Sequence, residues 1–296
     1  MKELARRVAA GEKVHLDKID PRDSASIDRA VGEAQLLKLN AELTRLQELL
    51  YAAASHSVLV VLQGLDTAGK DGTISHVMSN VNPQGCQVVA FKTPTALEQA
   101  HDFLWRVHQA APMRGILTIF NRSHYEDVLV VRVHNMVPPA VWERRYAQIV
   151  HFEELLASAN TIILKFYLHI SKDEQQERLL AREKDRDKAW KLSPTDWVER
   201  RSWDAYIGAY EDALSRCSIE AAPWYVVPAD RKWFRNLAIA QTLVDTLRAH
   251  EGQWREALEQ RGQIALQEVK AARATDAAPP RPPTVGDVGQ TTGGKA

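Results

Sequence analysis

Cysteine is scarce in this chain: among 296 residues there are only Cys86 and Cys217. Two cysteines are too few for a disulfide-stabilised scaffold, and neither has the spaced partners that a zinc or iron–sulfur site requires. This scarcity favours a reducing compartment, and we expect the protein to work in the cytoplasm.

Long apolar runs and an excess of charge are also absent. No stretch approaches the ~18 apolar residues of a membrane span, and the first residues lack the apolar core of a signal peptide. Lysine plus arginine and aspartate plus glutamate each number 38, so the formal net charge is zero. This balance argues against a strongly basic nucleic-acid-binding protein. We therefore expect neither a membrane nor a nucleic acid as a partner.

The chain does contain enough apolar sequence for a large core. Hydrophobic residues make up 45% and charged residues 26%, which is typical of globular proteins. Residues 1–22 show little periodicity and are expected to form an N-terminal arm, followed by one domain at residues 23–255. Residues 256–296 form a C-terminal extension. From about 271 it is rich in Pro, Gly, Ala and Thr, and there we expect disorder.

Strand-like and helical segments alternate along the domain. Short β-branched apolar runs, typical of buried strands, occupy residues 57–63, 86–91, 115–120, 161–170 and 224–228. Helical patterns precede, separate and follow them, at residues 26–53, 72–79, 97–109, 139–159, 172–186, 193–216 and 231–250. This alternation predicts an α/β fold of three layers, α/β/α, around a five-stranded parallel sheet with right-handed crossovers.

A phosphate-binding loop is predicted directly after the first strand. Residues 64–73 read GLDTAGKDGT and contain the G-x-x-x-x-G-K pattern, ending at Lys70. Glycines let successive backbone N–H groups turn towards phosphate oxygens, and the helix that follows adds the positive end of its dipole. The lysine brings a positive charge to the transferred phosphoryl group. The candidate phosphate-binding residues of the loop are Gly64, Ala68, Gly69, Lys70, Gly72 and Thr73.

Two acids set this loop apart from ordinary nucleotide-binding loops. The Ser or Thr that usually follows the lysine and holds magnesium is replaced by Asp71. Asp66 lies inside the loop, where a carboxylate in an anion cradle is costly unless a cation offsets it. Asp66 is therefore a candidate Mg2+ ligand, the alternative being a residue that shapes the turn. Asp71 either takes a direct part in binding or caps the helix.

A second polar cluster follows the third strand. Residues 119–133 read IFNRSHYEDVLVVRV, and ligands of parallel α/β sheets gather at the carboxyl ends of strands. If the third strand neighbours the first, this cluster lies beside the phosphate loop. Asp127 is then a second candidate Mg2+ ligand, and Arg122 suits bidentate contact with phosphate. Further candidates for nucleotide or phosphate binding are Asn121, Tyr125, Glu126 (alternatively a solvated helix-start charge) and, from the second helix, Arg106.

A cationic lid is predicted after the fourth strand. In kinases built on this plan, a helical lid at this place closes cations over the phosphates and excludes water. We place it at about residues 182–201. Acids nearly match the cations there, so a solvated helix with i,i+4 ion pairs is the alternative. The candidate phosphate contacts of the lid are Arg182, Lys188, Lys191 and Arg201.

Several separated motifs in order resemble the family-2 polyphosphate kinases. They are GLDTAGKDG, FLWRVHQ, FNRSHYEDVLVVRV, FYLHISKDEQQERL and APWYVVPADRKWFRN, and the resemblance covers residues 30–247. It implies a P-loop kinase fold similar to thymidylate kinase, with a helical lid. It also implies Mg2+-dependent phosphoryl transfer between inorganic polyphosphate and a nucleotide, with Mn2+ as a substitute metal.

The resemblance also implies roles for single residues. Asp66 and Lys70 match the acid and the lysine of the family's phosphate loop, Arg122 matches the arginine after the third strand, and Asp127 matches a second acid near the metal. Residues 182–191 match the lid. Catalytic roles are therefore expected for Asp66, Lys70, Arg122 and Asp127.

The variant after the third strand narrows the expected acceptor. Many family members read D-R-S-x-Y-N-R, where this chain has N-R-S-H-Y-E-D at residues 121–127. This form resembles the branch that phosphorylates both nucleoside monophosphates and diphosphates. The expected acceptors are AMP and ADP, with guanine nucleotides as an alternative. Family members are commonly dimers or tetramers, so a homo-oligomer is expected.

Two other functions stay open on the residues alone. An ATP-dependent kinase of a nucleotide or other small molecule needs the same loop, lid and Mg2+, and only the resemblance favours polyphosphate as donor. The second alternative is a nucleotide-binding module without turnover. The paired acids and the cationic lid argue against it.

Overall fold

The computed structural model describes residues 3–185, 187, 190 and 193–274. The chain divides into two compact units, residues 1–255 and 256–296, and the first contains the whole sheet. Within the described residues, no helix combines the length and the apolar character needed to cross a membrane.

Five parallel strands form most of the sheet. The predicted parallel α/β arrangement is confirmed, and the strand bounds agree to within two residues. β2 and β5 lie in the middle of the sheet and are buried almost throughout, which explains their unbroken β-branched and aromatic runs. The strands are β2 (Ser57–Gln63), β3 (Cys86–Ala90), β4 (Leu117–Asn121), β5 (Thr161–His169) and β6 (Trp224–Pro228).

A sixth strand corrects the predicted strand count. β1 (Arg6–Arg7) comes from the N-terminal arm and pairs antiparallel with β6, with Arg6 opposite Val226. The sheet order is β1-β6-β5-β2-β4-β3. The arm is also part of the core, since Val14 and Leu16 are 2% and 1% exposed. A strand of two residues carries no periodicity, so the sequence pattern did not reveal it.

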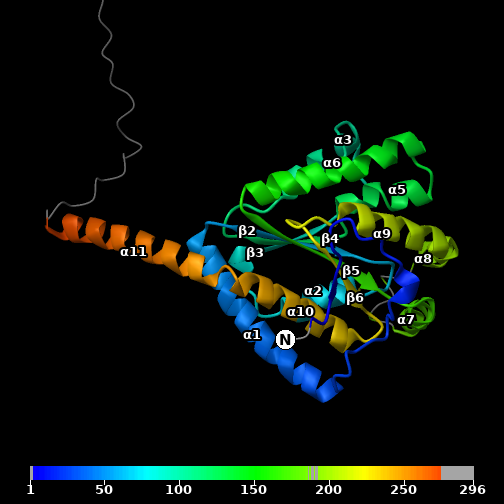
Figure 1. The fold of residues 1–296 in the computed structure, drawn as a ribbon, viewed down its shortest axis with the longest axis horizontal. Coiled ribbons are helices and arrows are strands. Elements are labelled where there is room, and N and C mark those ends of the chain that lie inside the picture. The colour runs from blue at the N-terminus through cyan, green and yellow to red at the C-terminus, as the bar shows by residue number, and fades with distance from the viewer. Residues whose placement is uncertain (1–2, 186, 188–189, 191–192, 275–296) are drawn as a thin grey trace, which may run out of the picture. The chain divides into compact units, whose positions relative to one another are not determined.

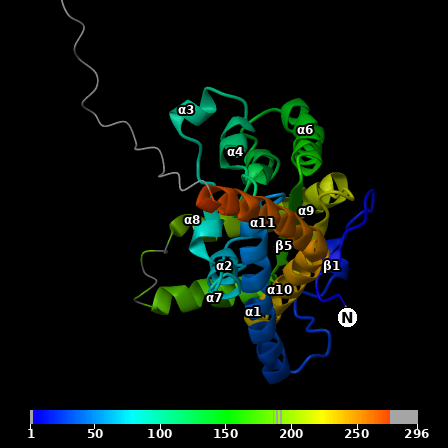
Figure 2. The ribbon, with the colours of Figure 1, turned by 90° about the vertical axis from the view of Figure 1, so that its left-hand side faces the viewer.

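Helices cover both faces of the sheet (Figure 1). α1 (Arg29–Ala53), α2 (Lys70–Val77) and α10 (Lys232–Arg248) cover one face, where α10 contacts both of the others. α6 (Pro139–Ser158) and α9 (Trp203–Cys217) contact each other over the opposite face. Figure 2 shows the same division after a quarter turn, with α1, α2 and α10 on one side and α4 and α6 on the other.

Some predicted helices are divided in the structure. The segment 97–109 forms two short helices, and in the turn between them the Asp102 carboxylate accepts a hydrogen bond from Leu104 N–H at 3.0 Å. A 3-10 turn at Arg200–Ser202, η5, likewise divides the segment 193–216. The remaining elements are η1 (Leu16–Lys18), η2 (Pro83–Gly85), α3 (Ala96–Gln99), α4 (Trp105–Ala110), η3 (His124–Asp127), α5 (Val130–Val133), α7 (Lys172–Lys184), α8 (Pro194–Glu199), η5 (Arg200–Ser202) and α11 (Glu251–Ala274). α11 extends the helical part of the chain beyond the helix expected to end at about residue 250.

Candidate functional site

The phosphate loop and the second polar cluster meet at one edge of the sheet. β2 pairs in parallel with β4, and Leu62 lies opposite Asn121. Both strands therefore end at the same edge, and the segments that follow them start side by side. The predicted neighbourhood of the first and third strands is confirmed.

The loop owes its shape to Gly69, the residue before α2. Its φ of +105° lies in the region that favours glycine, and a Cβ there would be 1.8 Å from Arg235 Nη1. α2 starts at the next residue, Lys70, so its N-terminal N–H groups lie at the end of the loop. This is the loop-to-helix geometry that binds phosphate in other proteins.

Lys70 is held over the loop. Its Nζ donates hydrogen bonds to the carbonyls of Gly64 at 2.6 Å and Leu65 at 3.4 Å, and the residue is only 9% exposed. Burial, together with the positive charge of Arg122, lowers the Lys70 pKa to about 8, although nearby carboxylates led by Asp66 oppose the shift. The ammonium is thus mostly charged at neutral pH.

The acidic side chains predicted for the site form ion pairs and hydrogen bonds with the predicted arginine and asparagine. Arg122 Nη2 donates to Asp66 Oδ1 at 2.7 Å, and Nη1 lies 3.6 Å from Glu126 Oε2. Asn121 Nδ2 donates to Asp71 Oδ1 at 2.8 Å. Burial acts to lower the Arg122 pKa, but Glu126 and Asp66 outweigh it and raise the value above the ordinary one. These five predicted side chains lie together in the structure.

A cavity of about 690 Å³ opens above the loop, and its wall is strongly basic. Among the described residues, three carboxylates line it, those of Asp66, Asp71 and Asp185. The cationic residues in the wall are Lys70, Lys92, Arg122, Arg178, Arg182, Lys232 and Arg235. Seven cations against three acids, next to a helix N-terminus, favour a polyanionic ligand.

Two arginines of this wall hold the phosphate loop in place, and sequence reasoning did not select them as site residues. Arg178 of α7 donates to the carbonyls of Thr67 at 2.9 Å and Ala68 at 3.1 Å, and to two carbonyls that follow β6. Arg235 of α10 also donates to Ala68 O at 3.1 Å. Burial and the charge of Arg178 lower the Arg235 pKa to about 10. Arg235 lies in the motif WFRN, whose resemblance was the one signal available.

Asp127 and Tyr125 are not brought into the cavity. Asp127 Oδ1 accepts from Arg145 at 2.9 Å, and burial raises the Asp127 pKa to about 6 against the effect of Arg145. Neither residue is in the cavity wall. Tyr125 is wholly buried and donates to Glu153 at 2.9 Å, so the expectation that it contacts the nucleotide is corrected: the turn η3 directs its ring into the core.

Other residues predicted for the site lie at the margin of the cavity. Arg106 Nη1 donates to Lys92 O at 2.9 Å and the guanidinium lies 5.3 Å from the Phe91 ring centroid, so it supports two residues of the cavity wall from behind. Gly72 is part of the wall, whereas Thr73 is buried beneath it. The Ala68 carbonyl accepts hydrogen bonds from both Arg178 and Arg235.

From the predicted lid segment, Asp185 lines the cavity, and so does Arg182. Its Nη1 donates to Asp196 Oδ2 at 2.8 Å, which joins α7 to α8. Burial, and next the charge of Asp66, raise the Asp196 pKa, so this acid lies within electrostatic range of the loop. Arg201 is exposed outside the cavity wall. Lys188 and Lys191 lie outside the described residues.

The donor set of the cavity fits a hard divalent cation. Asp66 and Asp71 offer carboxylate oxygens within a wall that otherwise attracts phosphate, and phosphate oxygens complete the ligands that Mg2+ prefers. Thr73 lies in the first turn of α2. Its hydroxyl oxygen is buried and has no hydrogen-bond partner among the described residues, so one polar oxygen there is unmatched.

Comparison with known proteins gives consistent matches. Residues 26–255 match the family model described as Polyphosphate kinase 2. Over 244 residues the chain is 52% identical to an AMP/ADP-polyphosphate phosphotransferase of Meiothermus ruber, covering 81% of this chain and 91% of that protein. It is 46% identical over 254 residues to an ADP-polyphosphate phosphotransferase of Rhodopseudomonas palustris, covering 81% and 88%. The crystal structure of Polyphosphate Kinase 2 from Arthrobacter aurescens is similar with a TM-score of 0.79 at 44% identity, covering 82% and 88%.

Proposed function

Because this chain belongs to the polyphosphate kinase 2 family, we propose that it transfers the terminal phosphoryl group of inorganic polyphosphate to both AMP and ADP. The chain is an enzyme, a polyphosphate kinase with the P-loop kinase fold. The double acceptor range is supported by the Meiothermus relative, whose name gives both AMP and ADP and which is 52% identical to this chain. The Rhodopseudomonas relative, whose name gives ADP, is 46% identical. The observation that carries the proposal is the basic cavity at the phosphate loop.

The proposed role of the protein is to position the reactants and neutralise their charge, because phosphoryl transfer needs little covalent chemistry from protein side chains. Lys70 and the N–H groups at the start of α2 hold the transferred group. Arg122 binds acceptor phosphates after exchanging its contact with Asp66. Arg182 and the other cations of the wall bind the donor chain. The transfer is reversible, since one phosphoanhydride bond is broken and another is formed.

A divalent cation is implied by the family, and we propose Mg2+, with Mn2+ as a substitute. When bound, the cation neutralises charge on the phosphate oxygens. Asp66 is the proposed ligand, because its carboxylate lines the cavity. Asp127 is the second candidate only after its ion pair with Arg145 opens.

The experiment that tests the proposal uses the purified chain, Mg2+, long-chain polyphosphate and either AMP or ADP, without ATP. Nucleotides are separated by chromatography over time. We expect both ADP and ATP to form from AMP. Formation of ATP from ADP alone would remove AMP from the acceptors. Transfer that occurs only when ATP is supplied would replace this proposal with an ATP-dependent kinase.

We extend the proposal to a homo-oligomer, a dimer or a tetramer, that works in the cytoplasm. The oligomer is supported by α1, which exposes the apolar side chains Val31 and Leu37. The cytoplasm is supported by the cysteines, which form no disulfide bond. Light scattering of the purified chain measures its mass in solution. A monomer at all concentrations would remove this part of the proposal.

A further inference from the structure

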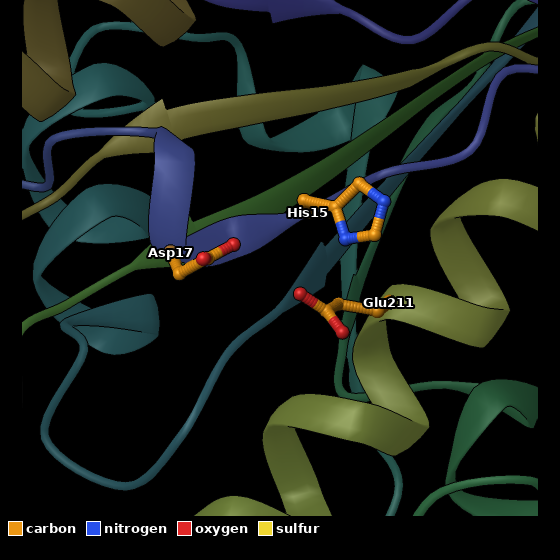
Figure 3. A group of neighbouring side chains, drawn as sticks. All are labelled: His15, Asp17 and Glu211. Atoms are coloured by element: carbon orange, nitrogen blue, oxygen red, sulfur yellow. The ribbon is translucent and has the colours of Figure 1, made fainter.

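A second group of side chains with metal-ligand spacing lies outside the cavity. Within the described ranges, one group of three His, Asp or Glu residues has ligand atoms that all lie within 4.8 Å of one another: His15, Asp17 and Glu211. Figure 3 shows Glu211 reaching from α9 towards His15 and Asp17 of the N-terminal arm. None of the three residues lines the basic cavity.

We propose that His15, Asp17 and Glu211 bind a divalent first-row transition cation of the Zn2+ class and so fasten the N-terminal arm to α9. One imidazole nitrogen and two carboxylate oxygens are ligands that Zn2+ accepts, and the open positions are filled by water. The two carboxylates balance the charge of a divalent ion. This site is separate from the cation of phosphoryl transfer and independent of the proposed function.

The backbone around the ligands is fixed before any ion binds. Val14 N–H donates to Ser215 Oγ at 2.9 Å, and Leu16 N–H donates to Glu211 Oε1 at 2.7 Å. Val14 and Leu16 are buried, and they flank His15 on both sides in the chain. Glu211 uses one carboxylate oxygen for the arm, which leaves the other for a cation. Binding therefore orders little besides three side chains.

A buried polar group beneath α9 is a second, independent observation. The Tyr167 hydroxyl is wholly buried and has no hydrogen-bond partner among the described residues. Its ring lies on the α9 side of β5, with its centroid 4.4 Å from that of Tyr210. Burial first, and then the charge of Glu211, raise the Tyr167 pKa, so the hydroxyl lies within electrostatic range of Glu211. Buried polar groups normally have a hydrogen-bond partner, so among the described residues the Tyr167 hydroxyl is an unmatched polar group beneath the helix that carries Glu211.

The charges of the cluster also favour a cation. The ligand oxygens of Asp17 and Glu211 lie within 4.8 Å of each other, so the two carboxylates repel when both are ionised. A divalent cation between them turns this repulsion into attraction. Because one side of the site belongs to the arm and the other to α9, the bound ion resists separation of the two.

The test measures zinc binding by the full chain in the presence of excess Mg2+, which occupies the hard oxygen ligands of the cavity. Equilibrium dialysis followed by elemental analysis gives zinc bound per chain, and thermal unfolding is recorded in parallel. The variants are His15→Ala, Asp17→Asn and Glu211→Gln. The last retains an oxygen that accepts from Leu16 N–H. The matched control is His101→Ala, which removes an exposed histidine outside the cluster.

We expect one tight zinc equivalent in the wild type and in His101→Ala, with a melting temperature raised by several degrees on zinc addition. Each cluster variant should weaken binding at least about tenfold and lose the thermal shift, while its circular dichroism stays native. Absence of a tight equivalent in the wild type would overturn the proposal. So would cluster variants that bind zinc as the wild type does.

Discussion

Lys70 is the side chain whose protonation state bears most directly on phosphoryl transfer. Its pKa of about 8 predicts that kcat/KM falls as the pH rises above that value, because the free enzyme then loses the ammonium charge. In Lys70→Arg the guanidinium stays charged, so the falling limb should move to higher pH even if the rate is lower. A pH profile of both enzymes makes the comparison. An unmoved limb in Lys70→Arg would assign the titration to another group.

The same pKa shift has the opposite effect on stability. The ordinary lysine pKa is 10.5 and the folded value is about 8, so between these values the unfolded chain binds more protons. The free energy of unfolding should therefore rise with pH across this window, by up to about 3 kcal/mol from this group. Lys70→Met lacks the titration and serves as the reference. Denaturant unfolding at several pH values measures the difference, and parallel curves for the two proteins would contradict the expectation.

Asp66 and Asp127 differ in what surrounds them, and this distinguishes their proposed roles. Asp66 lines the cavity, whereas Asp127 is buried against Arg145. We expect Asp66→Asn to raise the Mg2+ concentration for half-maximal activity about tenfold or more, a loss of roughly 1.4 kcal/mol in metal binding. Asp127→Asn should shift that concentration less. Mg2+ titrations at saturating polyphosphate provide the measurement, and a larger shift in Asp127→Asn would reverse the assignment.

Among the elements, η3 is held from below by a buried ionic network. Lys165 of β5 donates to the Tyr125 hydroxyl at 2.9 Å and to Cys217 O at 2.7 Å, and it pairs with Glu153 of α6. Lys165 and Glu153 are both wholly buried. Since Tyr125 belongs to η3, the network fixes the turn that carries Glu126 beside Arg122.

Removing one charge from this network should cost more than removing both. Lys165→Met leaves Glu153 buried without its cation, and we expect a loss of about 3–5 kcal/mol in the free energy of unfolding. The double variant Lys165→Met, Glu153→Leu leaves no unpaired ion and should recover much of that loss. Denaturant unfolding of both variants checks this. A double variant that is less stable than the single one would show that the pair itself stabilises the fold.

The parts of the site that the sequence could predict are those set by short contiguous patterns. Gly69 and Lys70 follow a strand and start a helix, so their place was fixed by local geometry. Asp66 and Arg122 could be brought together because parallel strands end at one edge. Arg235 lies on α10, far along the chain, and acts through backbone carbonyls, so no local pattern marks it. Tyr125 was expected at the site because it follows the third strand, but its hydroxyl bonds to Glu153 and Lys165 in the core, and no local pattern marks contacts with such distant parts of the chain.

For the whole molecule, the N-terminal arm completes the core. We expect Leu16→Ala to lower the free energy of unfolding by about 2–5 kcal/mol, because Leu16 is 1% exposed and its removal leaves a cavity. Leu97→Ala is the control: this side chain on α3 is 63% exposed, and its loss should change the free energy of unfolding by less than about 0.5 kcal/mol. Thermal or denaturant unfolding compares the two. Equal effects would show that the arm does not contribute to the core.

The strand and the buried residues of the N-terminal arm could not be predicted from the sequence. Its buried residues alternate with exposed ones over a few positions only, and its strand partner lies near the other end of the domain. Periodicity is a local signal, whereas pairing with β6 depends on the completed fold. The α/β alternation of residues 57–228, by contrast, was sufficient to predict the order of the parallel strands along the chain.

The pairing of β1 with β6 imposes an order on folding during synthesis. Arg6 leaves the ribosome before its partner Val226, which follows about 220 residues later. At 5–20 residues per second, the first strand waits on the order of ten to forty seconds for its neighbour. The arm must therefore stay available while the parallel strands assemble. The nascent chain can then close its sheet only after the β6 edge has emerged.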